Sequence, residues 1–259
     1  MKLSLIIPCY NEQEALLHFY RETKSVLASI PDEYELLFVN DGSNDKTLQI
    51  IEEYAKHDSH IKYLSFSRNF GKEAAMYAGF CNSDGDYVAV MDADIVDGAR
   101  DFRLMKKEMV QAIVEMGEYN RFSKGIFGWI GFRTYWLPYE NVERVAGETK
   151  WNFWKLFKYA VDGIINFSQA PLNIASWFGI GMTIISFVAL IGIVIRKMCF
   201  GDPVAGWAST ICIIIFIGGI QLFCIGVMGQ YVAKTYMEAK HRPHFTIAQT
   251  NKEGVKRVG

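Results

Sequence analysis

The sequence predicts an α/β domain followed by two membrane-spanning helices. In the first hundred residues, apolar runs of strand length alternate with segments of helical periodicity, which is typical of a parallel sheet covered by helices on both faces. Later in the chain, two long stretches, 174–195 and 203–233, contain no charged residue. The mean hydropathy is +0.09 although the N-terminal half is polar, so the apolar residues are concentrated in the last third.

The individual elements follow from the spacing of apolar residues. Each expected strand is a short apolar run bounded by polar or turn residues, and each expected helix has an apolar residue every three or four positions. The strands are 3–8, 35–40, 61–66 and 87–92, and the helices are 12–30, 46–57 and 71–80. We expect them to form a cytoplasmic domain of residues 1–150, with its ligand site at the carboxyl ends of the strands.

The two uncharged stretches predict transmembrane helices at 172–196 and 204–233. The uncharged stretches 174–195 and 203–233 are 22 and 31 residues long, and a helix needs roughly 20 apolar residues to cross the hydrocarbon core. Basic residues flank the pair on its outer sides, which predicts a multi-pass protein of the cytoplasmic (inner) membrane with both termini cytoplasmic. These residues are Arg144, Lys150, Lys155 and Lys158 before the pair, and Lys234, Lys240 and Arg242 after it. The polar segment 234–259 is expected to be a frayed cytoplasmic tail.

The segment 151–171 mixes tryptophans, aliphatic residues and two lysines. This composition suits an amphipathic juxtamembrane helix that lies in the headgroup layer. An ordinary packed helix that leads into the first span would have the same composition, so both interpretations stay open.

Composition also limits the classes of partner. The chain has 27 basic and 28 acidic residues, a formal net charge of -1, so it lacks the basic field that nucleic-acid-binding proteins use. The five cysteines form no C-x-x-C pair, and we expect them to be reduced.

Polar residues follow each expected strand. Carboxylates at the ends of the first, second and fourth strands, Glu12, Asp41 and Asp92, suit the hydroxyls of a ribose and a divalent cation. A single carboxylate at such a position, Glu12 or Asp45 for example, is as often only the N-cap of the next helix. Three convergent strand ends favour a binding site, because a cap needs no partner across the sheet.

Asp92 and Asp94 are separated by one residue at the end of the fourth strand. In an extended backbone their side chains lie on the same side, and two carboxylates so close repel each other unless a cation lies between them. Mg²⁺ or Mn²⁺ is the expected cation, and it would act as a Lewis acid toward a leaving diphosphate.

Six motifs in order resemble those of family 2 inverting glycosyltransferases, in the branch that contains dolichol-phosphate mannose synthases and bacterial bactoprenol glucosyltransferases. They are P-C-Y-N-E, V-N-D-G-S-N-D-K-T, S-R-N-F-G-K-E, G-D-Y-V-A-V-M-D-A-D, D-F-R-L-M and R-V-A-G-E-T-K. The resemblance covers nearly the whole chain and implies a GT-A (Rossmann-like) nucleotide-sugar-binding fold.

The resemblance also implies roles for individual residues. Those expected to bind the nucleotide sugar are Pro8, Tyr10, Glu12, Asp41, Lys72 and Asp92; those expected near the acceptor phosphate are Arg121, Arg144 and Lys150. The metal is assigned to Asp92 and Asp94. Asp94, Asp97 and Asp101 are the catalytic candidates, and the choice between Asp97 and Asp101 as a base or orienting group stays open. A strong base is dispensable, because a phosphate monoester has its second pKa near about 6 and is mostly ionised at neutral pH.

The implied reaction transfers a hexose, glucose from UDP-glucose, with inversion to undecaprenyl or another polyprenyl phosphate at the cytoplasmic membrane face, for cell-envelope glycan modification. Homo-oligomers are typical of the resembled family. The chain departs from the family after Asp94, where a segment of several tens of residues is missing and Val96 replaces a glutamine. The alternative interpretation is therefore a catalytically impaired pseudoenzyme or a membrane-bound scaffold subunit.

Overall fold

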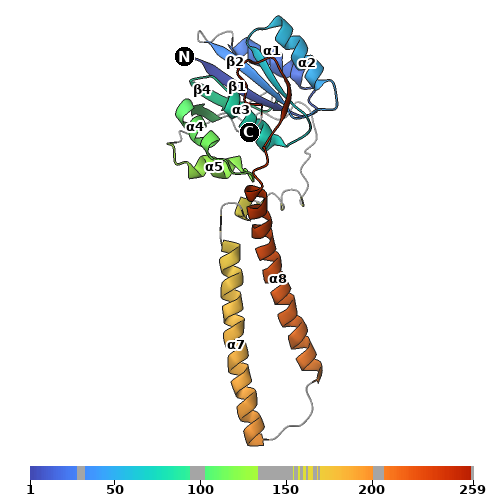
Figure 1. The fold of residues 1–259 in the computed structure, drawn as a ribbon, viewed down its shortest axis with the longest axis vertical. Coiled ribbons are helices and arrows are strands. Elements are labelled where there is room, and N and C mark those ends of the chain that lie inside the picture. The colour runs from blue at the N-terminus through green and yellow to red at the C-terminus, as the bar shows by residue number, and fades with distance from the viewer. Residues whose placement is uncertain are drawn as a thin grey trace. The chain divides into compact units, whose positions relative to one another are not determined.

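The computed structural model describes residues 1–27, 33–93, 103–133, 170–200 and 207–257, together with single positions between 154 and 168. The chain divides into two compact units (Figure 1). The first contains Met1–Asn152 and His241–Gly259, and the second contains Phe153–Lys240.

The first unit is a mixed α/β sheet with helices on both faces. Its strands are β1 (Leu3–Cys9), β2 (Tyr34–Asn40), β3 (Ile61–Phe66), β4 (Tyr87–Val90), β5 (Arg103–Lys106) and β6 (Ile247–Thr250). Its helices are α1 (Leu16–Leu27), α2 (Thr47–His57), α3 (Lys72–Asn82), α4 (Lys107–Glu115) and α5 (Ser123–Trp129). The four expected strands and three expected helices are confirmed, with ends that differ by a few residues.

The strand order is β5-β4-β1-β2-β3-β6. The four central strands are parallel, as the sequence predicts, and Leu3 of β1 pairs with Tyr34 of β2 and Tyr87 of β4. The two edge strands, β5 and β6, run antiparallel to their neighbours. The carboxyl ends of β1, β2 and β4 therefore meet at the same edge of the sheet.

Successive residues of the central strands belong to two different cores. Ile7 and Phe38 pack with Leu16 and Phe19 of α1 and with α2, whereas Ile6 packs with α3, α4 and α5 on the other face. All of these side chains are fully or almost fully buried. This arrangement explains the apolar runs of the sequence, because in a strand covered on both faces every residue points into a core and polar residues do not alternate with apolar ones.

The C-terminal tail corrects the expectation of a frayed segment. It returns to the sheet as β6, where the Thr250 hydroxyl donates a 2.6 Å hydrogen bond to the Tyr63 carbonyl. Phe245 is fully buried, and the Lys252 ammonium lies 2.7 Å from both Glu35 and Asp84. Apolar burial and an ion cluster, in which Lys252 and Glu35 are buried and Asp84 is exposed, thus attach this tail to the first unit.

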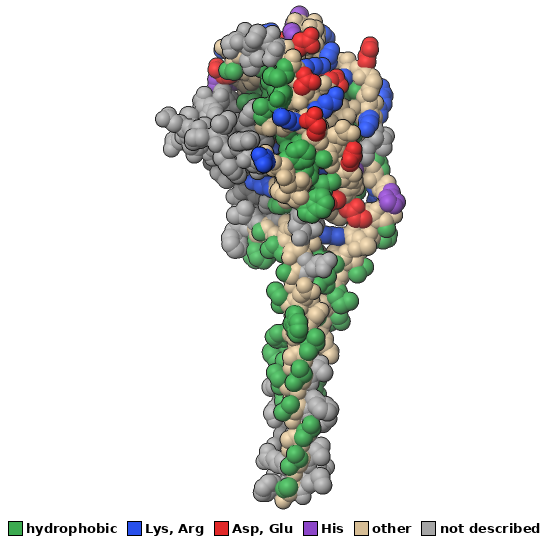
Figure 2. All heavy atoms as spheres, turned by 90° about the vertical axis from the view of Figure 1, so that its left-hand side faces the viewer, with side chains coloured by type: hydrophobic (Ala, Val, Ile, Leu, Met, Phe, Trp, Pro, Cys, Tyr) green, Lys and Arg blue, Asp and Glu red, His purple; other side chains and the backbone are tan. Residues whose placement is uncertain are grey.

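The second unit contains two long helices, α7 (Ala170–Phe200) and α8 (Trp207–Ala239), which include most of the two predicted spans. Within the described part of the chain, one segment, Phe216–Ala239, is long and apolar enough to cross a membrane, with a mean hydropathy of 1.5. The described surface of both helices is mostly apolar, whereas charged side chains gather on the first unit (Figure 2). Most of the segment 151–171 lies outside the described residues.

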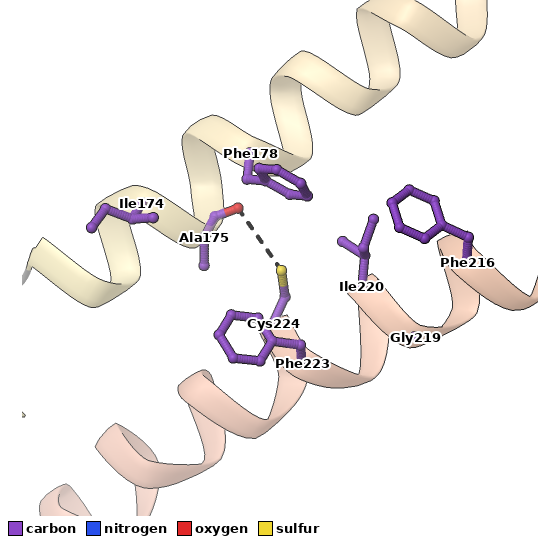
Figure 3. A pocket seen from close by; sticks show the side chains of 8 residues that line it. All are labelled: Ile174, Ala175, Phe178, Phe216, Gly219, Ile220, Phe223 and Cys224. Carbon is purple, nitrogen blue, oxygen red and sulfur yellow. Dashed lines mark hydrogen bonds between the residues drawn. The ribbon is translucent and has the colours of Figure 1, made fainter. Parts of the chain in front are cut away.

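An apolar cavity of about 540 Å³ lies between α7 and α8 (Figure 3). It is lined by Ile174, Ala175 and Phe178 of α7 and by Phe216, Gly219, Ile220, Phe223 and Cys224 of α8. The Cys224 thiol donates a long hydrogen bond of 3.9 Å to the carbonyl oxygen of Ala175 across this cavity.

Candidate functional site

A cleft of about 260 Å³ opens at the carboxyl ends of β1, β2 and β4, next to the first turn of α3. Its lining residues are Pro8, Cys9, Tyr10, Glu12, Asp41, Asn69, Gly71, Lys72, Ala75, Asp92 and Ala93. All six residues predicted to bind the nucleotide sugar are among them. The structure thus brings together side chains from four separate segments of the sequence.

The loops after β1 and β2 are joined by side-chain hydrogen bonds. The Asn11 amide N–H donates to the Ser43 hydroxyl at 3.0 Å, and the Glu12 amide N–H donates to the Thr47 hydroxyl at 2.9 Å. Asn11 has a positive φ of 55°, which asparagine tolerates better than most residues. These bonds fix the backbone that carries Tyr10 and Glu12 at the cleft.

Asp45 is not the N-cap of α2, because that position belongs to Lys46, but it binds backbone amides next to the helix start. Its carboxylate accepts hydrogen bonds from the amides of Thr47, at 2.9 Å, and Gln13, at 3.3 Å. Burial opposes ionisation, but hydrogen bonds from Thr47 and Gln13 outweigh it and hold the pKa of Asp45 below its ordinary value. Asp45 does not line the cleft.

Asp41 holds the loop between β3 and α3 against the end of β2. Its two carboxylate oxygens accept hydrogen bonds from the amides of Phe70, at 2.7 Å, and Gly71, at 2.9 Å. Burial raises the pKa of Asp41, and the two amide bonds and the Arg68 charge act in the opposite direction. The next residue, Gly42, has a φ of +63°, and a Cβ there would lie 2.4 Å from the carbonyl carbon of Arg68.

The Lys72 ammonium donates a 2.6 Å hydrogen bond to Asp92 inside the cleft. Lys72 is the first residue of α3, and Asp92 follows the end of β4. Both side chains are partly exposed, at 58% and 33%, so both are accessible to a ligand in the cleft. The pair places one partly exposed positive charge beside the carboxylate that the sequence assigns to a metal.

Cys9 also lines the cleft, although no role is predicted for it from the sequence. Its thiol is buried, and desolvation together with the nearby carboxylates of Glu12, Asp92 and Asp45 raises the pKa of Cys9 well above the ordinary value. The thiol is therefore protonated at neutral pH and is a poor nucleophile.

Several predicted site residues lie outside the described part of the chain: Asp94, Asp97, Asp101, Arg144 and Lys150. Among the described residues there is no group of three or more His, Cys, Asp or Glu side chains that could hold a metal ion.

Arg121, predicted to lie near the acceptor phosphate, is buried apart from this cleft. Its guanidinium donates hydrogen bonds to the carbonyl oxygens of Ile113 and Met116 at the end of α4, and it stacks 4.1 Å from the ring centre of Tyr77. Burial lowers the pKa of Arg121. Arg121 thus caps α4, and one side of it faces a second cavity of about 290 Å³.

The second cavity shares Asn69 and Gly71 with the cleft, and its other lining residues are Arg68, Phe70, Glu73, Ala74, Tyr119, Arg121 and His244. The sequence assigned no role to Arg68 and placed His244 in a solvated tail. His244 instead packs on the rings of Tyr77 and Tyr119, with ring centres 4.9 and 5.6 Å apart. The position of His244 in this cavity follows from the pairing of the tail with the sheet, which no local sequence pattern indicates.

Comparison with known proteins relates the chain to one family. The profile of glycosyl transferase family 2 matches residues 4–159. The bactoprenol glucosyl transferase of Shigella phage SfV is 36% identical over 301 residues, which cover 95% of this chain and 98% of the relative. A prophage bactoprenol glucosyl transferase homolog of Escherichia coli (strain K12) is 34% identical over 306 residues, covering 97% and 100%.

A solved structure, S. aureus TarS 1-349 in complex with UDP-GlcNAc, is similar over a smaller region, with a TM-score of 0.31 and 28% identity over 36% of this chain and 27% of that one. The aligned lengths with both bactoprenol relatives exceed the 259 residues of this chain. The relatives therefore contain residues with no counterpart here; that these residues follow Asp94 stays a prediction. The chain belongs to glycosyl transferase family 2 and is a glycosyltransferase.

Proposed function

We propose that the chain transfers a hexose from a nucleoside diphosphate sugar to a polyprenyl phosphate at the cytoplasmic face of a membrane. The proposed hexose is glucose, and its donor is UDP-glucose. The observation that carries the proposal is the single cleft lined by all six residues predicted to bind the donor. The names of the bactoprenol glucosyl transferases, similar over nearly their whole length, support the acceptor class and the sugar.

The cleft has the chemistry that a nucleotide sugar needs. Tyr10 is 42% exposed and offers a ring face to a base, while the Glu12 carboxylate can accept hydrogen bonds from ribose hydroxyls. Asp41 acts differently, because both of its oxygens already hold the loop before α3. We assign it the positioning of this loop, with a remaining lone pair available to the nucleoside.

A divalent cation, Mg²⁺ or Mn²⁺, fits the cleft in part. The Asp92 carboxylate is one-third exposed and lies beside a lysine, so it can accept a cation if Lys72 moves toward the donor diphosphate. Asp92 and Asp94 would hold the ion, which would supply Lewis-acid stabilisation of the leaving diphosphate. Lys72 would add a second positive charge to the same group.

The transfer itself needs few protein groups. A non-bridging oxygen of the ionised acceptor phosphate attacks the anomeric carbon, the bond from this carbon to the donor diphosphate breaks, and its electron pair leaves with the nucleoside diphosphate. One displacement at one carbon inverts its configuration. Because the nucleophile is already ionised at neutral pH, no residue has to remove a proton from it.

We further propose that α7 and α8 both cross the membrane and that both chain termini are cytoplasmic. The tail after α8 pairs with β3, so it occupies the same compartment as the N-terminal domain. An even number of crossings must therefore separate them, and two helices satisfy this requirement.

The test is hexosyl transfer by the full chain purified in detergent, with UDP-[¹⁴C]glucose, undecaprenyl phosphate and Mg²⁺ or Mn²⁺. We expect radiolabel in the lipid fraction, a product of inverted anomeric configuration by NMR, and loss of transfer in Asp92→Asn. Transfer from GDP-mannose with none from UDP-glucose would contradict the proposed donor.

A non-catalytic membrane subunit is the second candidate, favoured by the residues that the relatives have and this chain lacks. In that case the purified chain binds UDP, as measured by calorimetry, but transfers neither glucose nor another hexose. Transfer at a rate comparable with that of the phage SfV relative would eliminate this candidate.

A further inference from the structure

The second cavity is adjacent to the donor cleft. The two share Asn69 and Gly71, so the loop between β3 and α3 forms a wall common to both. This loop is held by Asp41 on one side and carries Arg68 on the other. A ligand group in the second cavity would therefore lie next to a nucleotide sugar in the cleft, with Asn69 and Gly71 bordering both.

The charged groups around this cavity are mostly positive. Arg68 stacks over Phe70, with 4.0 Å between the guanidinium carbon and the ring centre. Arg121 stacks in the same way over Tyr77, at 4.1 Å. Glu73 also faces the cavity, but its carboxylate accepts hydrogen bonds from the amide and the hydroxyl of Ser123 at the start of α5. The two guanidinium groups carry two positive charges, and Glu73 carries one negative charge, so the cavity lining has a net positive charge. His244 adds an imidazole ring to the lining.

His244 reaches the cavity because the tail is firmly bound to the sheet. The adjacent Phe245 is fully buried and stacks on Phe66, with ring centres 5.5 Å apart. His244 is also only five positions after Ala239, the last residue of α8, and five residues span at most about 18 Å. If the span in α8 ends at 233, His244 follows that end by 11 positions.

We infer that this cavity binds the phosphate monoester of the lipid acceptor, and that Arg68 and His244 are its ligands. The inference rests on the proposed function. Guanidinium groups are suited to phosphate oxygens, because their planar N–H groups match two oxygens at once. Arg68 supplies the exposed guanidinium, which donates one hydrogen bond of 3.0 Å to the Asn69 carbonyl. The Arg121 guanidinium is buried and donates to two carbonyls at the end of α4, so Arg121 contributes charge more than contact. The tail thus adds a ligand to the site in addition to stabilising the sheet.

The experiment measures binding of farnesyl phosphate, a short polyprenyl phosphate, to the full chain in detergent. Farnesol lacks the phosphate and inorganic phosphate lacks the chain, so the three probes separate the lipid headgroup from free phosphate. The variants are Arg68→Gln, Arg68→Lys and His244→Gln. The matched controls are Arg21→Gln and His18→Gln, two exposed positions of α1.

We expect Arg68→Gln to weaken farnesyl phosphate binding about tenfold or more, as loss of a charge-assisted pair does, and Arg68→Lys to weaken it less because it keeps the charge. His244→Gln should weaken it severalfold. The Kd for UDP and the Kd for farnesol should not change in any variant, and neither control should differ from the wild type. Inorganic phosphate should bind more weakly than farnesyl phosphate and depend on Arg68 in the same way.

The inference is wrong if Arg68→Gln and His244→Gln bind farnesyl phosphate as tightly as the two control variants. Its failure is separable from failure of the proposed function. If farnesyl phosphate binding depends on Arg68 but no hexose is transferred, the phosphate site is supported and the proposed reaction is wrong. If hexose is transferred and Arg68→Gln leaves the KM for the acceptor unchanged, the reaction is supported and the phosphate site is wrong. Because Arg68 is exposed, its substitution should leave the melting temperature unchanged, which separates loss of binding from unfolding.

Discussion

Lys72 donates a 2.6 Å hydrogen bond to Asp92 across the mouth of the candidate cleft. The two residues are 20 positions apart in the sequence: Lys72 begins α3, and Asp92 lies two residues after the end of β4. A carboxylate beside a movable ammonium group can exchange that partner for a cation, which releases the ammonium group toward a diphosphate. The pair thus connects the binding of the metal with the binding of the donor.

The first prediction concerns this pair. Lys72→Gln removes the positive charge but keeps a hydrogen-bond donor, so we expect the KM for UDP-glucose to rise about tenfold and the KM for the acceptor to stay unchanged. Steady-state kinetics with each substrate varied in turn measures both constants. Lys56→Gln, at an exposed position of α2 with no part in the cleft, is the control. An equal rise of both constants would contradict a role confined to the donor.

The second prediction concerns the tail. Phe245→Ala removes a fully buried ring from the core between β3 and α3 and should lower the free energy of unfolding by about 3–5 kcal/mol. Leu17→Ala, at an exposed position of α1, should change it little. Thermal unfolding in detergent, followed by circular dichroism, compares the two variants. Similar melting temperatures would show that the tail does not contribute to stability.

The third prediction concerns the glycine beside the cleft. Gly42→Ala adds a Cβ 2.4 Å from backbone atoms of Arg68 at a residue with a φ of +63°, so both strain and a clash result. Gly254 has a similar φ of +66° with no atom within 4 Å of such a Cβ. Gly42→Ala should therefore reduce the melting temperature and the affinity for UDP, whereas Gly254→Ala should reduce the melting temperature slightly and leave UDP binding intact. Equal melting temperatures for the two variants would contradict the clash.

The fourth prediction is a pH dependence at Asp58. This buried carboxylate accepts hydrogen bonds from the Lys24 ammonium, the Tyr20 hydroxyl and the His60 amide, each at 3.0 Å. Burial opposes its ionisation, but these bonds outweigh burial and lower the pKa of Asp58 below its ordinary value. A lowered folded-state pKa gives stability that is present above the unfolded value of about 4 and is lost as pH falls through the folded-state pKa.

Asp58→Asn should therefore melt at a lower temperature than the wild type at pH 7, and the difference should narrow as the pH falls from about 4 to 2. Melting temperatures across this range measure the effect. Glu22→Gln, at an exposed position of α1, serves as the control and should follow the wild type. A difference that is constant across the pH range would show that the carboxylate charge contributes nothing.

The sequence was sufficient to predict the central sheet and the cleft. Apolar runs that are buried on both faces identify β1 to β4, and in a parallel sheet the carboxyl ends of these strands must meet. The carboxylates Glu12, Asp41 and Asp92 could therefore be assigned to one site from the sequence.

The edges of the sheet could not be predicted in the same way. β6 has four residues, Ile247–Thr250, in a polar tail, and its pairing with β3 depends on contacts between residues almost 190 positions apart. No local pattern of hydrophobic residues records such a contact. For the same reason the position of His244 in the second cavity was missed, and the role of Arg121 as a cap of α4 became evident only from the hydrogen bonds of its guanidinium.

The pairing of β6 with β3 also determines when the sheet can be completed during synthesis of the chain. Tyr63 and Thr250 are 187 residues apart, and at about 5–20 residues per second a ribosome needs about 10–40 s to make the intervening chain. During this time β3 is an open edge strand that can pair with other chains. The sheet is therefore completed only after α7 and α8 have been synthesised.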